Sequence, residues 1–252
     1  MLNIIEHADD VVELNLDRPP VNALNPELVA RLDEDIDKAV AAGAGAVVVS
    51  GKPGLFSAGL DVPELLALDE SGMRDFWQQF FGLLERVARC PVPLATALTG
   101  HSPAGGTVIA LFADYRVQAE GNFQLGLNEV QVGLVVPPVI HQALVRLIGP
   151  YPAERHLVAG RMIAGAEALE LGLVDELVPA EEVSGRAVEW CRSLLKLPRH
   201  SMTAMRRLCR ADLTALFDDR EALDLDGFVR VWFAEETQAS LRALVEQLKQ
   251  DA

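Results

Sequence analysis

Glu129 is the residue whose surroundings in the sequence best suit acid–base chemistry. It is the only ionisable side chain between Glu120 and His141, and glycines and valines flank it throughout residues 126–138. An apolar setting disfavours the charged carboxylate and raises its pKa toward neutrality, where the group can both take and return a proton. The alternative is a solvated glutamate on a surface turn, and the local sequence leaves both interpretations open.

Two glycine-containing turns can offer backbone N–H groups to an oxygen on which negative charge develops. The first is Ser57-Ala58-Gly59, and the second is Gly105-Gly106, which follows Ser102-Pro103. We predict that Ser102 caps a helix over 104–112, with Pro103 in its first turn and free N–H groups at its positive end. Such donors can stabilise an oxyanion. Structural explanations also exist, namely close packing of a helix on a sheet and an ordinary strand-to-helix turn.

The elements that must position these residues follow an α/β pattern. Short apolar runs predict strands at residues 2–5, 11–16, 46–50, 94–99, 115–119 and 174–178. Apolar residues at helical spacing predict helices at 27–41, 151–157, 166–171 and 180–197, and an amphipathic segment at 228–248. Asn25 and Asp61 are predicted helix caps. Strand, helix and strand in this spacing indicate crossover connections.

The composition excludes several classes of partner. The chain has 252 residues, half of them hydrophobic, which is enough for one large domain or one domain with a helical extension. Its formal net charge of -15 argues against nucleic acid or an anionic membrane as a partner. The uncharged stretch 90–113 contains prolines and glycines, so we do not expect it to span a membrane.

Cysteine usage and the first residues predict a cytoplasmic protein. Cys90, Cys191 and Cys209 form no close pair, which fits reduced thiols and gives neither a disulfide framework nor a metal site. No secretion or organelle signal is visible at the start of the sequence. A basic cluster near the end is either a solvated helix face or a phosphate-contacting patch; it contains Arg199, Arg206, Arg207 and Arg210.

Three motifs occur in an order that resembles the crotonase (enoyl-CoA hydratase/isomerase) superfamily. They are Phe-Ser-Ala-Gly-Leu-Asp at 56–61, Pro-Ala-Gly-Gly at 103–106 and Gly-Leu-Asn-Glu-Val-Gln-Val-Gly at 126–133. The resemblance covers nearly the whole chain, and within the superfamily it is strongest to the monofunctional mitochondrial-type 3,2-trans-enoyl-CoA isomerases. It implies a spiral of ββα units over residues 1–195. A C-terminal helical region, 196–252, is then expected to form a homotrimer or dimer of trimers and to close the pocket.

The resemblance also implies a ligand, a fatty acyl thioester of coenzyme A, with no separate cofactor and no metal. In the family pattern the thioester oxygen lies between two backbone N–H groups, which match Ala58 and Gly105. Coenzyme A is expected to follow Ala23-Leu24 and the stretch made by Phe56, Ser57, Gly59 and Leu60. Aromatic residues that could line an acyl tunnel or belong to the core are Trp77, Phe80, Phe81, Trp232 and Phe233.

The residue type at position 108 distinguishes hydratases from isomerases within the superfamily pattern. Hydratases typically carry a second glutamate at the matching position to activate water, which valine cannot do. The expected reaction is therefore an isomerisation in fatty-acid β-oxidation: Glu129 takes a proton from carbon 2 of a 3-enoyl-CoA and returns it to carbon 4. The alternatives are a hydratase or dienoyl-CoA isomerase that uses Asp61 or Asp114, and a non-catalytic acyl-CoA-binding oligomer.

Overall fold

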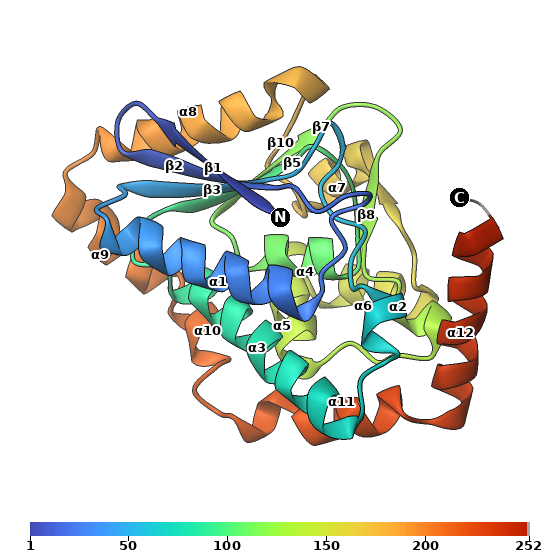
Figure 1. The fold of residues 1–252 in the computed structure, drawn as a ribbon. Helices are drawn as coiled ribbons and strands as arrows, with labels where there is room; N and C mark the ends of the chain where they lie inside the picture. Colours follow the sequence, from blue (N-terminus) through green and yellow to red (C-terminus); the bar gives the residue numbers. More distant parts are fainter. Residues whose placement is uncertain (251–252) are drawn as a thin grey trace.

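A six-stranded sheet forms one layer of the molecule (Figure 1). The structure is a computed structural model that describes residues 1–250, except for the side chain of residue 222. The spatial order is β1-β2-β3-β5-β7-β10, made by β1 (Leu2–His7), β2 (Val11–Leu16), β3 (Ala46–Ser50), β5 (Leu94–Leu98), β7 (Tyr115–Ala119) and β10 (Glu176–Val178). Only β1 and β2 pair antiparallel, and the other neighbours are parallel.

A second sheet of short strands follows the first along the chain. Its order is β4-β6-β8-β9, with bounds Gly54–Leu55, Gly100–Pro103, Gln124–Gly126 and Ile163–Ala164. Strands β3, β5 and β7 of the large sheet are each followed by β4, β6 and β8 of the small one, and then by a helical segment. This repetition confirms the predicted α/β spiral of ββα units.

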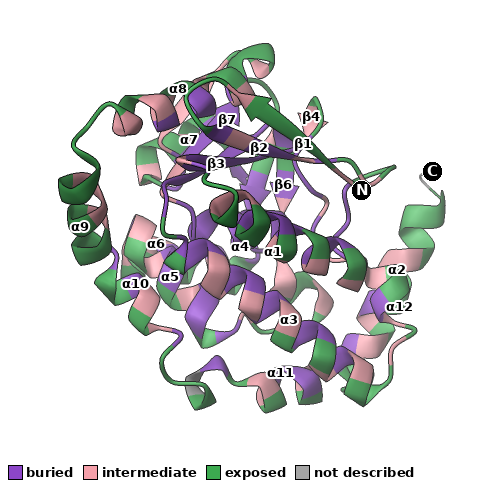
Figure 2. Cartoon of the chain, turned by 60° about the vertical axis from the view of Figure 1, so that its left-hand side comes forward, coloured by how far each residue is buried: buried purple, intermediate pink, exposed green. Residues whose placement is uncertain are grey.

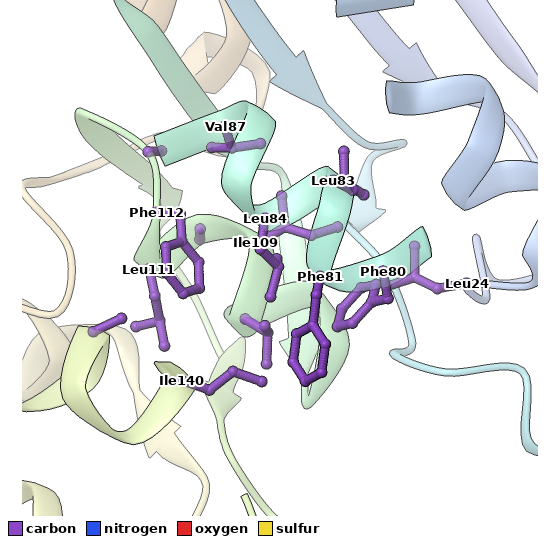
Figure 3. Close-up of a cluster of buried hydrophobic side chains, with 14 of the residues drawn as sticks. Leu24, Phe80, Phe81, Leu83, Leu84, Val87, Ile109, Leu111, Phe112 and Ile140 are labelled. Atoms are coloured by element: carbon purple, nitrogen blue, oxygen red, sulfur yellow. The ribbon is translucent and has the colours of Figure 1, made fainter. Parts of the chain in front are cut away.

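Helices cover both faces of the large sheet. Figure 1 shows α8 (Val183–Leu195) on one face, with α1 (Pro26–Ala41), α3 (Glu70–Arg89), α4 (Gly105–Leu111) and α5 (Pro138–Ile148) on the other. Every residue of α4 is buried, because this uncharged helix lies inside the molecule (Figure 2). Figure 3 shows Phe81 and Leu84 of α3 packed near Ile109 of α4. A fully buried side chain of this size contributes about 1.5–3 kcal/mol to folding.

The aromatic residues of α3 belong to this core. Trp77 lies 5.4 Å from Phe80, 5.3 Å from Phe81 and 3.8 Å from Phe228, measured between ring centroids. Trp232 is fully buried, whereas Phe233 is 39% exposed. Among the five candidates for an acyl tunnel, four therefore pack in the hydrophobic core.

The second half is largely helical, as predicted. It contains α6 (Pro150–Ala159), α7 (Gly165–Leu171), α9 (Arg199–Cys209), α10 (Ala211–Ala215), α11 (Leu225–Trp232) and α12 (Glu235–Gln250). The amphipathic segment predicted at 228–248 is two helices, because the chain turns after Trp232 and starts α12 at Glu235. Residues on both sides of position 195 share one hydrophobic cluster. In the part of the chain that is described, every helix is too short or too polar to cross a membrane.

Candidate active site

The N–H group of Gly105 lies at the start of α4. The prediction that Ser102 caps this helix is wrong: Ser102 and Pro103 belong to β6, where they pair with Leu125 and Gly126 of β8. The capping position is Ala104, at φ +45° and without a side-chain hydrogen bond to the helix. Among residues 1–250, the Gly105 N–H has no intramolecular acceptor. It is therefore free to donate to a ligand.

The turn at 57–61 supplies a different N–H group from the one predicted. The Ala58 N–H donates to the carbonyl of Val21 at 3.0 Å, so the fold itself uses it and the assignment of this donor must be corrected. Leu24 forms a parallel bridge with Leu60, through the Gly59 carbonyl and the Asp61 N–H. In such a bridge the Leu60 N–H points away from Leu24, and it has no acceptor within the described chain.

The segments that carry Leu60 and Gly105 lie close together because glycines let them approach. A Cβ atom built on Gly59 would lie 3.1 Å from the Pro103 carbonyl oxygen and 3.4 Å from the Gly105 nitrogen. One built on Gly105 would lie 3.5 Å from the Gly59 Cα. Gly59 also has φ +85°, which favours glycine. The two segments that carry the free N–H groups are thus in close contact.

Buried polar side chains fix the first of these segments. The Ser57 hydroxyl donates to the Asn22 carbonyl at 2.7 Å and accepts the Gly59 N–H at 3.1 Å. The Asn22 side chain in turn donates to the carbonyls of Leu16 and Phe56 at 3.1 and 3.0 Å. Sequence reasoning missed Asn22, although a polar residue between Val21 and Ala23 was a signal. Ser57 and Asn22 hold the turn in the shape that leaves the Leu60 N–H free.

Glu129 begins the short 3-10 helix η1 (Glu129–Val132). The residue is half-buried, but its Oε2 atom is shielded from solvent and has no hydrogen-bond partner. Burial raises the pKa of this carboxyl to about 7, opposed only by its own backbone N–H. The predicted upward shift of the pKa is confirmed, and a solvated surface carboxylate does not describe this group.

The segment that carries Glu129 is tied to the helix that carries Gly105. Strand β8 ends at Gly126, whose carbonyl accepts the Ala104 N–H at 2.8 Å. The Gly126 N–H donates to the Thr107 hydroxyl, also at 2.8 Å. Only two residues lie between Gly126 and Glu129, so these bonds constrain where Glu129 lies. Sequence reasoning missed Thr107.

The other predicted site residues fall into two groups. Leu24 lies at the site, because a Cβ atom on Gly105 would come within 2.8 Å of its Cδ1. Ala23, Phe56 and Val108 are buried, with exposures of 9%, 0% and 2%. Phe56 and Val108 both belong to the main hydrophobic cluster. Val108 lies one turn into α4 from the Gly105 end, and the helix brings no second carboxylate there.

Two arginines of the basic cluster serve the fold. Arg206 pairs with Asp114 through two nitrogens at 2.8 and 2.7 Å, and Arg210 reaches the same carboxylate at 3.0 Å. Arg210 also donates to the carbonyls at the ends of α3 and α4, those of Ala88, Phe112 and Ala113. The phosphate-contacting interpretation therefore fails for these two residues. Within residues 1–250, no group of three or more His, Cys, Asp or Glu side chains is arranged to hold a metal ion.

Comparisons with known proteins all point to the same family. Residues 6–251 match the model of the enoyl-CoA hydratase/isomerase family. The chain is 32% identical to human "Enoyl-CoA delta isomerase 1, mitochondrial" over 245 residues, covering 96% of this chain and 81% of that protein. It is 33% identical to "Probable enoyl-CoA hydratase echA17" of Mycolicibacterium paratuberculosis over 229 residues, covering 88% and 86%.

Solved structures share the same architecture. The crystal structure of human mitochondrial delta3-delta2-enoyl-CoA isomerase superposes with a TM-score of 0.93 at 30% identity, covering 99% of this chain and 98% of that one. An enoyl-CoA hydratase from Bacillus halodurans superposes with a TM-score of 0.87 at 20% identity, covering 96% and 99%. The second likeness concerns the fold alone.

Proposed function

Because the chain belongs to the enoyl-CoA hydratase/isomerase family, we propose that it moves the double bond of a 3-enoyl-CoA thioester to the conjugated 2-trans position. The observation that carries the proposal is the raised pKa of the Glu129 carboxyl, which lies on a segment bonded to the helix that begins at the free Gly105 N–H. Val108, where hydratases typically have a glutamate, supports isomerisation over addition of water.

The proposed mechanism moves one proton across three carbons. The Leu60 and Gly105 N–H groups donate to the thioester oxygen, and the Glu129 carboxylate removes a proton from carbon 2. The electron pair of that C–H bond delocalises toward the oxygen and gives a dienolate, whose charge the two donors stabilise by several kcal/mol. The protonated Glu129 then returns the proton to carbon 4, and the conjugated product leaves with the enzyme unchanged.

The acidic residues that a hydratase or dienoyl-CoA isomerase could use are already engaged. Asp61 caps α2 (Val62–Leu65) by accepting the Glu64 N–H at 3.1 Å, and it pairs with Arg18 at 2.7 Å. Asp114 accepts from Arg206, from Arg210 and from the Leu94 N–H. Neither carboxylate is available to activate water, which favours isomerisation. Hydratases are nevertheless among the relatives, so hydration is the second candidate.

Coenzyme A enters this proposal as part of the substrate. The loop at Ala23-Leu24 and the turn at 57–60 adjoin each other at the Leu24–Leu60 bridge, and hydrogen bonds of Asn22 and Ser57 hold them in place. A pre-formed loop can meet pantetheine with little ordering cost. We also propose an oligomer of this chain as the working form, as is typical of the family.

The deciding experiment follows the absorbance of the conjugated thioester after purified protein is mixed with a 3-enoyl-CoA. The wild type is expected to form the conjugated product, and Glu129→Gln is expected to lose this activity while still binding the acyl-CoA. Glu120→Gln, which changes an exposed glutamate nearby, is the matched control and should behave as the wild type. Equal rates for wild type and Glu129→Gln overturn the proposal. Formation of 3-hydroxyacyl-CoA from a 2-enoyl substrate favours the hydratase.

A further inference from the structure

The C-terminal helix α12 touches the molecule over a narrow footprint. Thr237 and Leu241 are its buried residues, and most of its remaining surface is exposed (Figure 2). It packs against η1, which carries Glu129, and against α2, which begins directly after the Leu60-Asp61 turn. One lightly attached helix thus contacts the segment of the base and the segment of one N–H donor.

Thr237 makes the contact with η1. Its hydroxyl donates to the carbonyl of Gly133 at 3.0 Å, and the Thr237 residue is 3% exposed. Gly133 ends η1 at φ +77°, and a Cβ atom built on it would lie 3.1 Å from the Thr237 oxygen. The same turn closes on Glu129, because the Leu134 N–H donates to the Glu129 carbonyl at 3.1 Å. The hydroxyl therefore holds the end of the turn that starts with the base.

Helix α6 and Gly160, which follows it, also contact η1. The Gln131 side chain donates to the Gly160 carbonyl at 2.8 Å, and a Cβ atom on Gly160 would come within 2.7 Å of Val130. Contacts from two helices thus fix η1. Helices α6 and α12 each have two buried residues, but α12 has 16 residues and α6 has 10, so a smaller share of α12 is buried.

From this geometry we propose that Thr237 is a positioning residue, whose hydroxyl couples the docking of α12 to the placement of Glu129 relative to the Leu60 and Gly105 N–H groups. The inference rests on the proposed function. Without the hydroxyl, the Gly133 carbonyl loses this partner and α12 loses its hydrogen bond to the end of η1, so η1 can relax toward solvent. A small displacement of a reacting group is costly, because proton transfer depends on its distance and angle to the substrate.

A positioning role of Thr237 should change the pKa of Glu129, because relaxation of η1 lets water reach the carboxylate. Burial is the cause that raises the pKa of Glu129 to about 7, and no charged group contributes to that shift. The ionisable residues on the two helices that pack on η1 are therefore not its source; they include Glu154, Arg155 and His156 on α6 and Glu235 and Glu236 at the start of α12. If η1 relaxes, the pKa of Glu129 falls toward its ordinary value of 4.5.

The test compares Thr237→Val, Thr237→Ala and Thr237→Ser in the full chain. The valine and alanine variants lose the hydroxyl, and we expect kcat to fall about tenfold or more with KM changed much less. The pH at which kcat/KM reaches half its plateau should also move to lower pH. Thr237→Ser keeps the hydroxyl and should restore both values. Ser240→Ala is the matched control, because the Ser240 hydroxyl bonds only to the Glu236 carbonyl of its own helix.

The outcomes separate this inference from the proposed function. Wild-type kcat and pH profile in Thr237→Val and Thr237→Ala, with Glu129→Gln inactive, overturn the role of Thr237 and leave the isomerase intact. Full activity in Glu129→Gln overturns the isomerase itself. The inference is also overturned if kcat falls equally in Thr237→Ser and Thr237→Ala while the pH profile of kcat/KM stays unchanged. Thermal unfolding of each variant identifies any that fail to fold, and the smaller alanine variant then replaces valine.

Discussion

The hydroxyl of Thr107 accepts the backbone N–H of Gly126 at 2.8 Å and donates to the carbonyl of Ser102. It thereby joins the first turn of α4 to strands β6 and β8 at one buried point. The donor N–H of Gly105 lies two residues before Thr107, and Glu129 lies three residues after Gly126. One side chain therefore links the segment of the proposed N–H donor to the segment of the proposed base.

Replacing Thr107 by valine tests this link. The variant keeps the shape of the side chain but leaves the Gly126 N–H unpaired in a buried place, which lowers the free energy of unfolding by about 1–3 kcal/mol. We expect kcat/KM to fall by about tenfold or more, because the base shifts relative to the donors. Thr107→Ser should recover most of both losses. Denaturant unfolding and steady-state kinetics with a 3-enoyl-CoA measure them, and unimpaired catalysis in the valine variant would show that the link is structural only.

A methyl group at Gly105 should block the proposed oxyanion position. The new Cβ would lie 2.8 Å from the end of the flexible Leu24 side chain, which can move aside, and 3.5 Å from Gly59. We therefore expect Gly105→Ala to fold but to lose about a hundredfold in kcat/KM. Gly82→Ala is the matched control, because a Cβ there meets nothing within 4 Å on helix α3. Comparable activities in the two variants would rule out this position for the oxygen.

Glu129 should make the stability of the protein depend on pH. Its pKa is raised from 4.5 to about 7 in the folded state, so the folded protein holds this proton more tightly than the unfolded chain. The resulting stabilisation is fully present below pH 4.5 and is lost as the pH rises through 7. Glu129→Gln avoids burying the charge, so above pH 8 we expect it to be more stable than the wild type by up to about 2–3 kcal/mol.

Unfolding of both proteins at pH 5 and pH 8.5 checks this prediction. The difference between variant and wild type should be larger at the higher pH. An equal difference at both values would mean that the carboxylate is not desolvated in the folded state.

Asp114 should be essential for stability rather than for substrate binding. Its side chain is 8% exposed and holds both Arg206 and Arg210, which are themselves 13% and 8% exposed. Asp114→Asn leaves these buried guanidinium groups without a counter-charge, and we expect a loss of about 3 kcal/mol in the free energy of unfolding. Asp218→Asn, at a 70% exposed partner of Arg89, should change it by less than about 1 kcal/mol.

Denaturant unfolding measures both losses, and titration with an acyl-CoA measures binding. A weakened affinity with unchanged stability in Asp114→Asn would restore the phosphate-contacting interpretation of the arginine cluster.

Elements governed by local patterns could be predicted from the sequence. The strands at 11–16, 46–50 and 115–119 have the predicted bounds, because each is an apolar run that the sheet buries. The caps at Asn25 and Asp61 are also confirmed, since each side chain accepts an N–H three residues ahead. The raised pKa of Glu129 could be anticipated because no other ionisable group lies nearby in the sequence.

Features that depend on distant partners could not be predicted. The Ala58 N–H looks free in the sequence, but Val21 occupies it, and the free group is Leu60. Ser102 has the residue type of a helix cap, but pairing with Leu125 keeps it in a strand. The arginines near the C-terminus resemble a surface patch, whereas Asp114, about ninety residues earlier, draws two of them inward. Each correction comes from a contact between segments far apart in the chain.

The burial of arginines also affects how fast a ligand with several phosphates can bind to this protein. Arg116, Arg206 and Arg210 are largely buried and pair with Asp175 and Asp114, so three of the 22 lysines and arginines are not free to attract phosphates to a chain with formal net charge -15. Long-range repulsion should then slow the arrival of a phosphate-bearing thioester in dilute buffer. At 0.1 M salt this repulsion is largely screened beyond about 10 Å. The second-order rate constant for substrate binding should therefore rise with ionic strength, opposite to the trend for enzymes whose charge attracts the substrate.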